Sequence, residues 1–547
     1  MNEHAGAPGP SGMRHQVARR VNVVADRGED LGGAGQAPAD GDEVGTFTRC
    51  HRVEFAGVTT DDKHVQTLVD HRSHVELEGV KIEPLVAVHR GDRDHAHAGE
   101  RSDQVGPAGR WVLLDNQISK HISSEIVGEV HDTTARLQAD IDRCAEPGGG
   151  VVTIAAGRYV VGTLVLRSGV HLHLEPGCTL FGSTDLNDYP RHVPALGSYS
   201  DNYTVRSIIY AESATDVGIT GRGTLDGQGA AFLGNEYLDR PYMMRFVDCD
   251  RVRVRDVTLR NSAMWVQHYL GCRDVLVDGV TVSSHSNINN DGIDIDSCER
   301  VRIANCDIAS EDDAIVIKAT APRPCRDVVV TNCVLQSDCN AFKIGTETVG
   351  DISDVVFSNS TIRECGRSAI AIETVDGGSL ERVLVSTILF RSSVGGIFVR
   401  LGHRGRPFEA VGTADYYDND TGPAQRSVGT MRDITISNVI GEGCDTIGCS
   451  ITGHPDAPIR DIRLHDVRMT FEGNGVAPVG AVPEQLDKYP EYNMFGPLPA
   501  FGLYARHVVG LRLDDVDLRA LAPDGRPPLV LDDVVVADDV RADRVNQ

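Results

Sequence analysis

The sequence has few aromatic residues, a shortage of positive charge and no long apolar run. Aromatic side chains make up 5% of its 547 residues, and 53 Lys and Arg stand against 79 Asp and Glu, which gives a net charge of −26. This charge argues against nucleic acids and anionic membrane surfaces as partners. Because no stretch of about 18 consecutive apolar residues occurs, we expect no membrane-spanning helix.

Paired cysteine motifs are also missing. None of the 13 cysteines belongs to a Cys-x-x-Cys pair, which argues against a metal site. The first residues contain no apolar stretch of the kind found in signal peptides. We therefore expect a cytoplasmic protein if the chain starts as written, with secretion as the alternative if the true start lies elsewhere.

The chain divides into two parts of different composition. Residues 1–130 are rich in Gly, Asp, Arg and His and show little periodicity, so we predict a weakly ordered extension. From Asp132 to Cys144, a capping residue and apolar positions at helical spacing predict a short helix. Strand-like segments follow, and we expect this helix to cap the open end of a strand array within residues 131–547.

A segment of alternating apolar and polar residues recurs through that second part, mostly every 23 to 28 residues. Copies begin at Cys249, Cys272, Cys298, Cys325 and Ile352 and continue at 380, 431 and 459. The period is too short for propeller blades, and no leucine-rich frame is present. The repeat predicts an all-β fold, a single-stranded right-handed parallel β-helix of about ten coils with the short N-terminal capping helix.

Two further features fit a stack of coils. One Asn falls at the same repeat position in three copies, as Asn305, Asn332 and Asn359, which predicts an asparagine ladder at a tight turn. Two long segments, 404–430 and about 472–500, interrupt the repeat. Insertions in such folds usually lie on one face and build the binding groove.

Three consecutive copies carry the acidic residues that point to chemistry. Residues 291–296 read DGIDID, residues 313–318 read DAIVIK and residues 340–345 read NAFKIG. Stacked coils would bring the backbones of Asp291 and Asp313 within about 5 Å. Carboxylates that close raise at least one pKa, which a general acid requires. A solvated edge and a calcium site are the other uses of such a cluster.

These acidic blocks resemble those of a known family. Residues 289–294 (NNDGID) and 311–313 (EDD) are similar to the two acidic motifs of glycoside hydrolase family 28, the polygalacturonases and rhamnogalacturonan hydrolases. Residues 221–229 (GRGTLDGQG) and 261–265 (NSAMW) support the resemblance, which extends over about residues 133–540.

The resemblance implies an inverting hydrolase that cleaves a pectin-like polysaccharide or its oligosaccharides. Asp312 would be the general acid, while Asp291 and Asp313 would hold and deprotonate the attacking water. Inversion requires the carboxyl groups to lie about 6.5–9.5 Å apart. Neither a metal nor a cofactor is needed for this chemistry.

The sequence departs from the polygalacturonase pattern in the next two coils. A Gly-His-Gly motif is replaced by residues 339–341 (CNA), and an Arg-Ile-Lys motif, whose cations grip galacturonate, is replaced by residues 371–373 (AIE). We therefore expect a glycan of rhamnogalacturonan type or another uronate- or deoxysugar-containing polymer, cut in an exo manner or as an oligosaccharide. Lys343 and Arg400 are candidates for a displaced carboxylate clamp, and Glu373 for contacts with neutral hydroxyls. The other predicted substrate contacts are Asn340, Asp294, Lys318, Trp265 and His268.

Two other functions are compatible with the sequence. A β-helix polysaccharide lyase would need calcium or a basic residue at the chemistry, where this chain has acids. A non-catalytic glycan-binding β-helix would keep the groove without turnover. The sequence predicts no oligomeric state.

Overall fold

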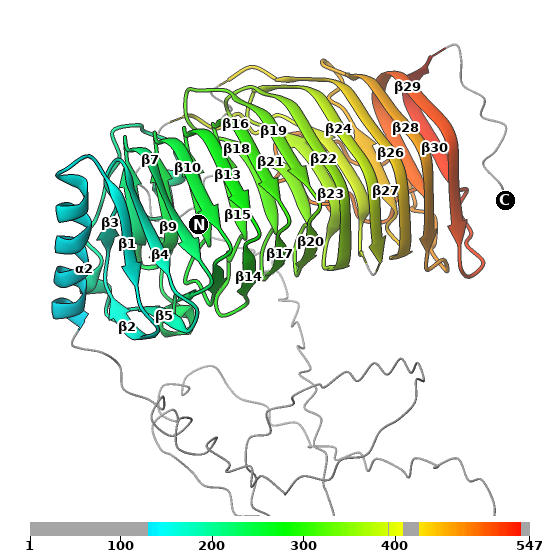
Figure 1. Ribbon diagram of the computed structural model, residues 1–547. Helices are drawn as coiled ribbons and strands as arrows, with labels where there is room; N and C mark the ends of the chain where they lie inside the picture. The colour runs from blue at the N-terminus through cyan, green and yellow to red at the C-terminus, as the bar shows by residue number, and fades with distance from the viewer. Residues whose placement is uncertain (1–129, 392, 409–425, 538–547) are drawn as a thin grey trace, which may run out of the picture. The chain divides into compact units, whose positions relative to one another are not determined.

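The structure is a computed structural model that describes residues 130–391, 393–408 and 426–537. The predicted weakly ordered extension, residues 1–130, lies outside this range except for Val130. Part of the first predicted insertion, residues 409–425, also lies outside it. The described chain is a β-helix of parallel strands, with one α-helix at its N-terminal end (Figure 1).

The predicted capping helix is present as α2, Val130–Ala145. Its buried residues include Leu137 and Ile141, which join the main hydrophobic core. The Gln138 amide donates to the Val165 carbonyl at 3.0 Å and accepts from the Val165 N–H at 2.8 Å. The helix thereby covers the end of the stack and satisfies a backbone group that a further strand would otherwise pair.

The strands stack into three parallel ladders. The first contains β1 (Gly150–Ile154), β4 (Val170–Leu174), β7 (Thr215–Gly221), β10 (Asp250–Arg255), β13 (Arg273–Asp278), β16 (Glu299–Ala304) and β19 (Cys325–Thr331). The second contains β2 (Gly157–Val161), β5 (Cys178–Gly182), β8 (Thr224–Asp226), β11 (Thr258–Arg260), β14 (Thr281–Ser284), β17 (Asp307–Ser310) and β20 (Val334–Ser337). Both ladders continue in the long strands β22 (Ile352–Cys365), β24 (Ser379–Arg391), β26 (Thr430–Cys444) and β28 (Ile459–Phe471).

The third ladder carries the acidic blocks. It runs through β3 (Leu164–Val165), β6 (Ser207–Glu212), β9 (Tyr242–Val247), β12 (Gln267–Leu270), β15 (Ile293–Asp296), β18 (Ile315–Ala319), β21 (Phe342–Thr348), β23 (Ser368–Thr374), β25 (Gly396–Leu401) and β27 (Cys449–Thr452), and ends in β29 (Leu503–Ala520) and β30 (Leu529–Val536). The predicted right-handed parallel β-helix is confirmed, with a few more coils than expected. Among the described residues, four short 3-10 helices lie in its loops, at Leu186–Asp188, Tyr199–Asn202, Gly229–Phe232 and Tyr237–Asp239.

The core is a stack of apolar side chains from the inward face of each coil. In β15 and β18 these are Ile293, Ile295, Ile315 and Ile317, all fully buried. They repeat every second residue because alternate side chains of a strand point to opposite faces. The outward residues of the same strands include the charged Asp294, Asp296 and Lys318 as well as Val316, and this alternation directs the acids of the third ladder away from the core.

The turns are built from residues in the left-handed conformation, as the asparagine repeat predicted. Asn305, Asn332 and Asn359 have φ of 59°, 56° and 49°. The Asn332 amide donates to the Asn305 side-chain oxygen, and Asn305 donates to Asp278 at 2.7 Å. Asn359 donates instead to the Thr331 hydroxyl at 3.4 Å. The predicted ladder therefore joins two of the three asparagines.

The cysteines that open successive repeats, Cys249, Cys272, Cys298 and Cys325, are buried and carry free thiols.

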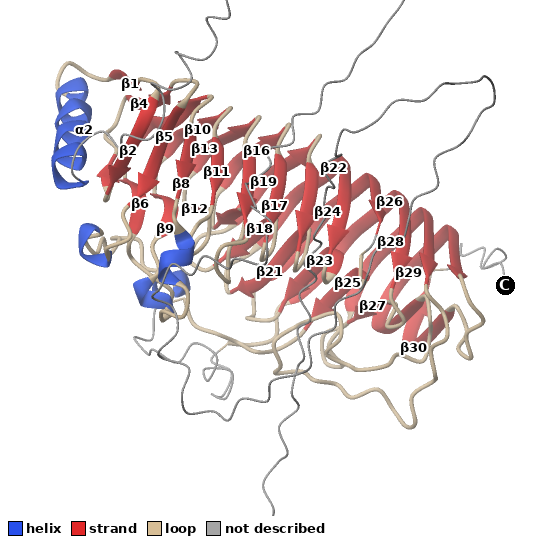
Figure 2. Ribbon diagram, turned by 90° about the horizontal axis from the view of Figure 1, so that it is seen from below, coloured by secondary structure: helices blue, strands red, loops and turns tan. Residues whose placement is uncertain are grey.

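Long loops gather along the side of the β-helix formed by the third ladder (Figure 2). Among the described residues, no helix is long and apolar enough to cross a membrane.

The core stack predicts the effect of a cavity. Replacing Ile317 with Ala should lower the free energy of unfolding by about 2–5 kcal/mol, because a fully buried side chain is lost from a closely packed interior. Leu384 is 39% exposed, and Leu384→Ala should change it by no more than about 0.5 kcal/mol. Urea unfolding of both variants measures the difference, and equal effects would contradict the inward assignment.

Candidate active site

The predicted columns of side chains are present in the third ladder. His268, Asp294, Val316, Lys343, Ala371 and Phe398 occupy one column of paired positions, and Asp296 pairs with Lys318 in another. The register differs from the predicted stacking in two places: it shifts between Ile317 and Ala319, so Gly345 does not align with Lys318, and Ser368 pairs with Gly396 instead of Gly395. Strand β21 bulges at the first of these places, and the bulge brings Glu347, instead of Gly345, next to Lys318.

A cavity of about 460 Å³ opens beside the acidic blocks. The predicted residues that line it are Asp291, Asp312, Asp313, Lys318 and Trp265. It is completed by Tyr203, Tyr237, Met264, Ile288, Asn289, Glu311, Cys339, Glu347, Arg367, Tyr489 and Glu491. The three predicted catalytic carboxyl groups therefore meet at one cavity, although they come from turns of two different coils.

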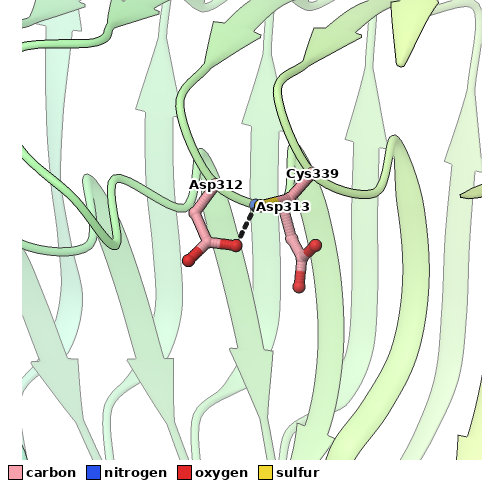
Figure 3. A group of neighbouring side chains, drawn as sticks. All are labelled: Asp312, Asp313 and Cys339. Carbon is pink, nitrogen blue, oxygen red and sulfur yellow. Dashed lines mark hydrogen bonds between the residues drawn. The ribbon is translucent and has the colours of Figure 1, made fainter. Parts of the chain in front are cut away.

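Asp312 and Asp313 precede β18 and lie side by side. An Asp312 carboxylate oxygen accepts from the backbone N–H of Asp313 at 2.9 Å (Figure 3), and the other accepts from the Asn289 amide at 3.3 Å. Burial and the charge of Asp313 raise the pKa of Asp312, although Lys343 and Arg367 oppose them. Of the two neighbouring carboxyl groups, Asp312 and Asp313, Asp312 is therefore better suited to carry a proton.

Asp313 has the opposite surroundings. Its carboxylate lies 3.1 Å from the Lys343 ammonium and accepts from the Asn340 backbone N–H at 2.9 Å and side-chain amide at 2.7 Å. Burial alone would raise its pKa, but Lys343, Lys318 and Asn340 together lower it. Asp313 is thus held ionised. Lys343 and Asn340, predicted as substrate contacts, act here on the carboxylate instead.

Asp291 and Asp294 belong to the coil before. Both are buried, and the Asp291 Oδ1 and both Asp294 oxygens have no hydrogen-bond partner among the described residues. Burial raises the pKa of each well above its usual value; the charge of Asp312 adds to the shift at Asp291, and Lys318 opposes it at both. Asp291 faces the cavity, whereas Asp294 does not line it.

Lys318 lies in an ion-pair network at the cavity wall. Its ammonium is 3.1 Å from Glu347 and 4.9 Å from the centre of the Trp265 ring. Arg404 lies 3.7 Å from the same Glu347 and donates to Asp376 at 2.9 and 2.6 Å. Burial would raise the pKa of Glu347, but Lys318 and Arg404 lower it far below the usual range. The positive charge of Lys318 is therefore already compensated by a carboxylate of the same chain.

Glu373 is the acid that stands where the family has a cation. It is buried, lies 4.0 Å from Lys343 and accepts from the Thr346 hydroxyl at 3.2 Å. Burial raises its pKa to about 8 in spite of Lys343, with Glu491 adding to the rise. Glu373 does not line the cavity, so the structure supplies no direct contact with neutral hydroxyls from this residue.

Two other residues predicted to contact the substrate, His268 and Arg400, interact with groups of the protein itself. His268 is fully buried, and its Nε2 lies 3.3 Å from Asp296. Arg400 donates to the backbone carbonyls of Glu484 and Gln485 at 2.8 and 3.1 Å, and stacks 5.3 Å from the Phe495 ring. Arg400 therefore anchors the segment 472–502 and does not form a carboxylate clamp in the cavity.

Sequence reasoning missed several residues of this cavity. Glu347 lies in the bulge of β21, and Arg367 and Glu491 form an ion pair across the wall. Glu311 also lines it, with a pKa raised to about 7 by burial and by Asp312. Glu311 had a signal, its place in the acidic block 311–313, and Tyr489 and Glu491 lie in the insertion of about 472–500 that predicts part of the binding groove. The structure places all three in the cavity wall.

One group of side chains has the spacing of a metal site. Single ligand atoms of Asp312, Asp313 and Cys339 lie within 4.8 Å of one another, so the Asp312 and Asp313 carboxylates are closer together than the about 6.5–9.5 Å expected for an inverting pair. Calcium takes six to eight oxygen ligands, whereas this group offers two carboxylates and a thiol, and Asp313 is already bound to Lys343. The donor set therefore fits calcium poorly, and burial raises the pKa of the Cys339 thiol, which disfavours the thiolate.

Comparison with known proteins agrees with these motifs. The family model for glycosyl hydrolases family 28 matches residues 144–486. A probable polygalacturonase of Vitis vinifera is 31% identical over 205 residues, which cover 35% of this chain and 42% of that protein. An exopolygalacturonase of Zea mays is 22% identical over 407 residues, covering 71% of this chain and 90% of that protein.

Solved structures share the architecture. A family 28 exopolygalacturonase of Yersinia enterocolitica superposes with a TM-score of 0.57 at 18% identity, covering 76% of this chain and 77% of that one. A hyperthermoactive exopolygalacturonase of Thermotoga maritima gives a TM-score of 0.51 at 22% identity, covering 62% and 83%. At these identities the likeness establishes the fold.

Glu347 and Glu373 predict opposite outcomes for one substitution. Glu347→Gln should lower the free energy of unfolding at pH 7 by about 3–5 kcal/mol, because it leaves Lys318 and Arg404 buried without their shared anion. Glu373→Gln should leave the free energy of unfolding unchanged or raise it, because the amide replaces a side chain that is neutral when folded but ionises on unfolding at pH 7. Urea unfolding at pH 7 distinguishes them.

The pH dependence of the free energy of unfolding provides a control for both variants. A raised carboxyl pKa stabilises the fold fully below the ordinary value of 4.5, and that contribution is lost as pH rises toward about 8. Glu373→Gln should therefore flatten the stability curve between pH 5 and 8. The depressed pKa of Glu347 stabilises above its ordinary range, so Glu347→Gln should leave this slope unchanged. The reverse pattern would contradict the two assignments.

Proposed function

Because the chain belongs to glycosyl hydrolases family 28, we propose that it hydrolyses O-glycosidic bonds in a pectin-like polysaccharide or its oligosaccharides, with inversion at the anomeric carbon. The predicted enzyme class, a glycosidase, follows from the family. One observation carries the proposal: a carboxyl group of raised pKa, Asp312, adjoins an ionised one, Asp313, at the wall of a cavity.

Each carboxyl group has a role that its surroundings support. Asp312 donates its proton to the glycosidic oxygen as the bond to the anomeric carbon breaks. The water that attacks the opposite face of that carbon gives its proton to Asp313, which Lys343 and Asn340 hold as the anion. Asp291 accepts a hydrogen bond from the same water. Asn289 orients Asp312 through its amide.

The alternative reaction, β-elimination by a lyase, has less support. A lyase must remove a proton from carbon, which needs an unprotonated base or a bound cation. The basic residues lining the cavity are Lys318 and Arg367, and both are paired with acids, Glu347 and Glu491. A product absorbing near the ultraviolet edge, from a new carbon–carbon double bond, would favour elimination over hydrolysis.

The assignment of the acid is tested by Asp312→Asn. A screen of pectic oligosaccharides identifies the substrate, and proton NMR of the first product should show the inverted anomer. Loss of the acid should then reduce turnover by about 10²- to 10⁴-fold. Asp338→Asn is the matched control, because Asp338 is 62% exposed one coil away and does not line the cavity. Full activity of the folded Asp312→Asn protein would refute the proposed role.

The role of Asp313 is tested through its partner. Lys343→Gln removes the charge that lowers the pKa of Asp313, so that pKa should rise. The base must be ionised, and the acidic limb of the kcat/KM profile should therefore move to higher pH. Lys488→Gln, at an exposed residue of the 472–502 segment, is the control. A uniform loss at every pH, with an unmoved limb, would assign Lys343 a structural role only.

A further inference from the structure

We propose that the cavity accepts an uncharged sugar ring at the cleaved bond, and that Glu491 sets this specificity by occupying Arg367, which a uronate carboxylate would otherwise bind. This inference rests on the proposed function, because it concerns the ring held at the same cavity. It names the class of that ring, a neutral hexose or deoxyhexose, and the residue pair that selects it.

The Arg367–Glu491 ion pair joins two segments far apart in the chain. Arg367 precedes β23 in the stack of coils, whereas Glu491 belongs to the segment 472–502 between β28 and β29. Both line the cavity, and Arg367 Nη1 donates to the Glu491 carboxylate. The side chains are 39% and 20% exposed, so the guanidinium lies where a ligand could reach it. A carboxylate of the protein itself fills that place.

Three other cations around the cavity are also paired with acids. Lys318 is paired with Glu347, and Lys343 lies between Asp313 at 3.1 Å and Glu373 at 4.0 Å. Arg404 forms a two-point ion pair with Asp376. A fourth cation, Arg240, is buried and donates to the Asn289 side-chain oxygen at 3.0 Å. Lys318, Lys343 and Arg404 each therefore face an acid of the same chain. A uronate would have to displace one of those acids before it could form an ion pair with any of these three.

The lining also offers no excess of positive charge to an anionic ring. Its cations are Lys318 and Arg367, and of its six acids Asp313 and Glu347 are held ionised, whereas burial raises the pKa of Asp291, Glu311, Asp312 and Glu491. A like-charged group brought into such a wall costs free energy unless a cation compensates it. Carboxylates accept hydrogen bonds well from neutral hydroxyls. The aromatic rings of Trp265 and Tyr489 offer apolar faces for the carbon side of the ring.

Two monosaccharides that differ only at C6 test this specificity. D-Galactose carries a hydroxymethyl group there and D-galacturonate a carboxylate, and saturation-transfer NMR with titration measures the affinity for each. Wild-type protein should bind galactose at least as tightly as galacturonate. Glu491→Gln should free Arg367 and strengthen galacturonate binding about tenfold, the equivalent of one ion pair. The affinity for galactose should stay unchanged, and added salt should weaken only the gained affinity.

Matched variants assign the effect to the pair. Asp487→Asn makes the same change of charge at an exposed residue of the same segment and should leave both affinities unaltered. Adding Arg367→Gln to Glu491→Gln should abolish the gain. If Glu491→Gln fails to fold, Glu491→Ala and the wild-type affinity ratio provide the same test.

Three results would overturn the inference: tighter binding of galacturonate than galactose by the wild type, no gain in Glu491→Gln, or binding of neither sugar by any of the proteins. None of these measurements needs turnover. Absence of hydrolysis across the pectic screen, together with the expected binding pattern, would therefore reject the proposed function while leaving the specificity of the cavity intact.

Discussion

Hydrogen bonding between the backbones of successive coils places the three reacting carboxyl groups of this protein. At the acidic blocks, Gly292 N–H donates to Asp313 at 2.9 Å, Ala314 to Asn340 at 2.9 Å and Ala341 to Ser368 at 3.1 Å. These bonds hold equivalent residues of neighbouring coils one strand spacing apart, about 4.8 Å. Residues more than twenty positions apart in the chain thus become neighbours, and carboxyl groups from two coils share one cavity.

The same stacking explains why some acidic groups of the site stay ionised while the pKa of others is raised. Alternation along each strand reserves the inner face for residues such as Ile295 and Ile317, so the charged side chains collect on the outer face and at the turns. Crowded there and shielded from water, they must pair or lose their charge. Asp313 pairs with Lys343 and stays ionised, whereas its neighbour Asp312 forms no salt bridge among the described residues, and burial and the charge of Asp313 raise its pKa.

The segment 472–502 adds what the coils do not supply. Arg400 anchors it through two backbone carbonyls, and the segment in turn places Tyr489 and Glu491 in the cavity wall. The coils therefore bring the reacting acids together, and this insertion shapes the charge that a substrate meets. Such a division allows the sugar specificity to change without disturbing the stack that positions Asp291, Asp312 and Asp313.

The sequence by itself determined the β-helix, the capping helix and the columns of the third ladder, because the period of the repeat and the alternation along each strand are local properties. The repeat also predicted that Asp291, Asp312 and Asp313 lie close together. Only the tertiary structure decided the partners of the cations. The bulge at Gly345 shifts the register without a periodic signal, and the capture of Arg400 and Arg367 depends on how an irregular segment folds back over the coils. Periodicity predicts which residues stack, but contacts made across an insertion follow from packing in three dimensions.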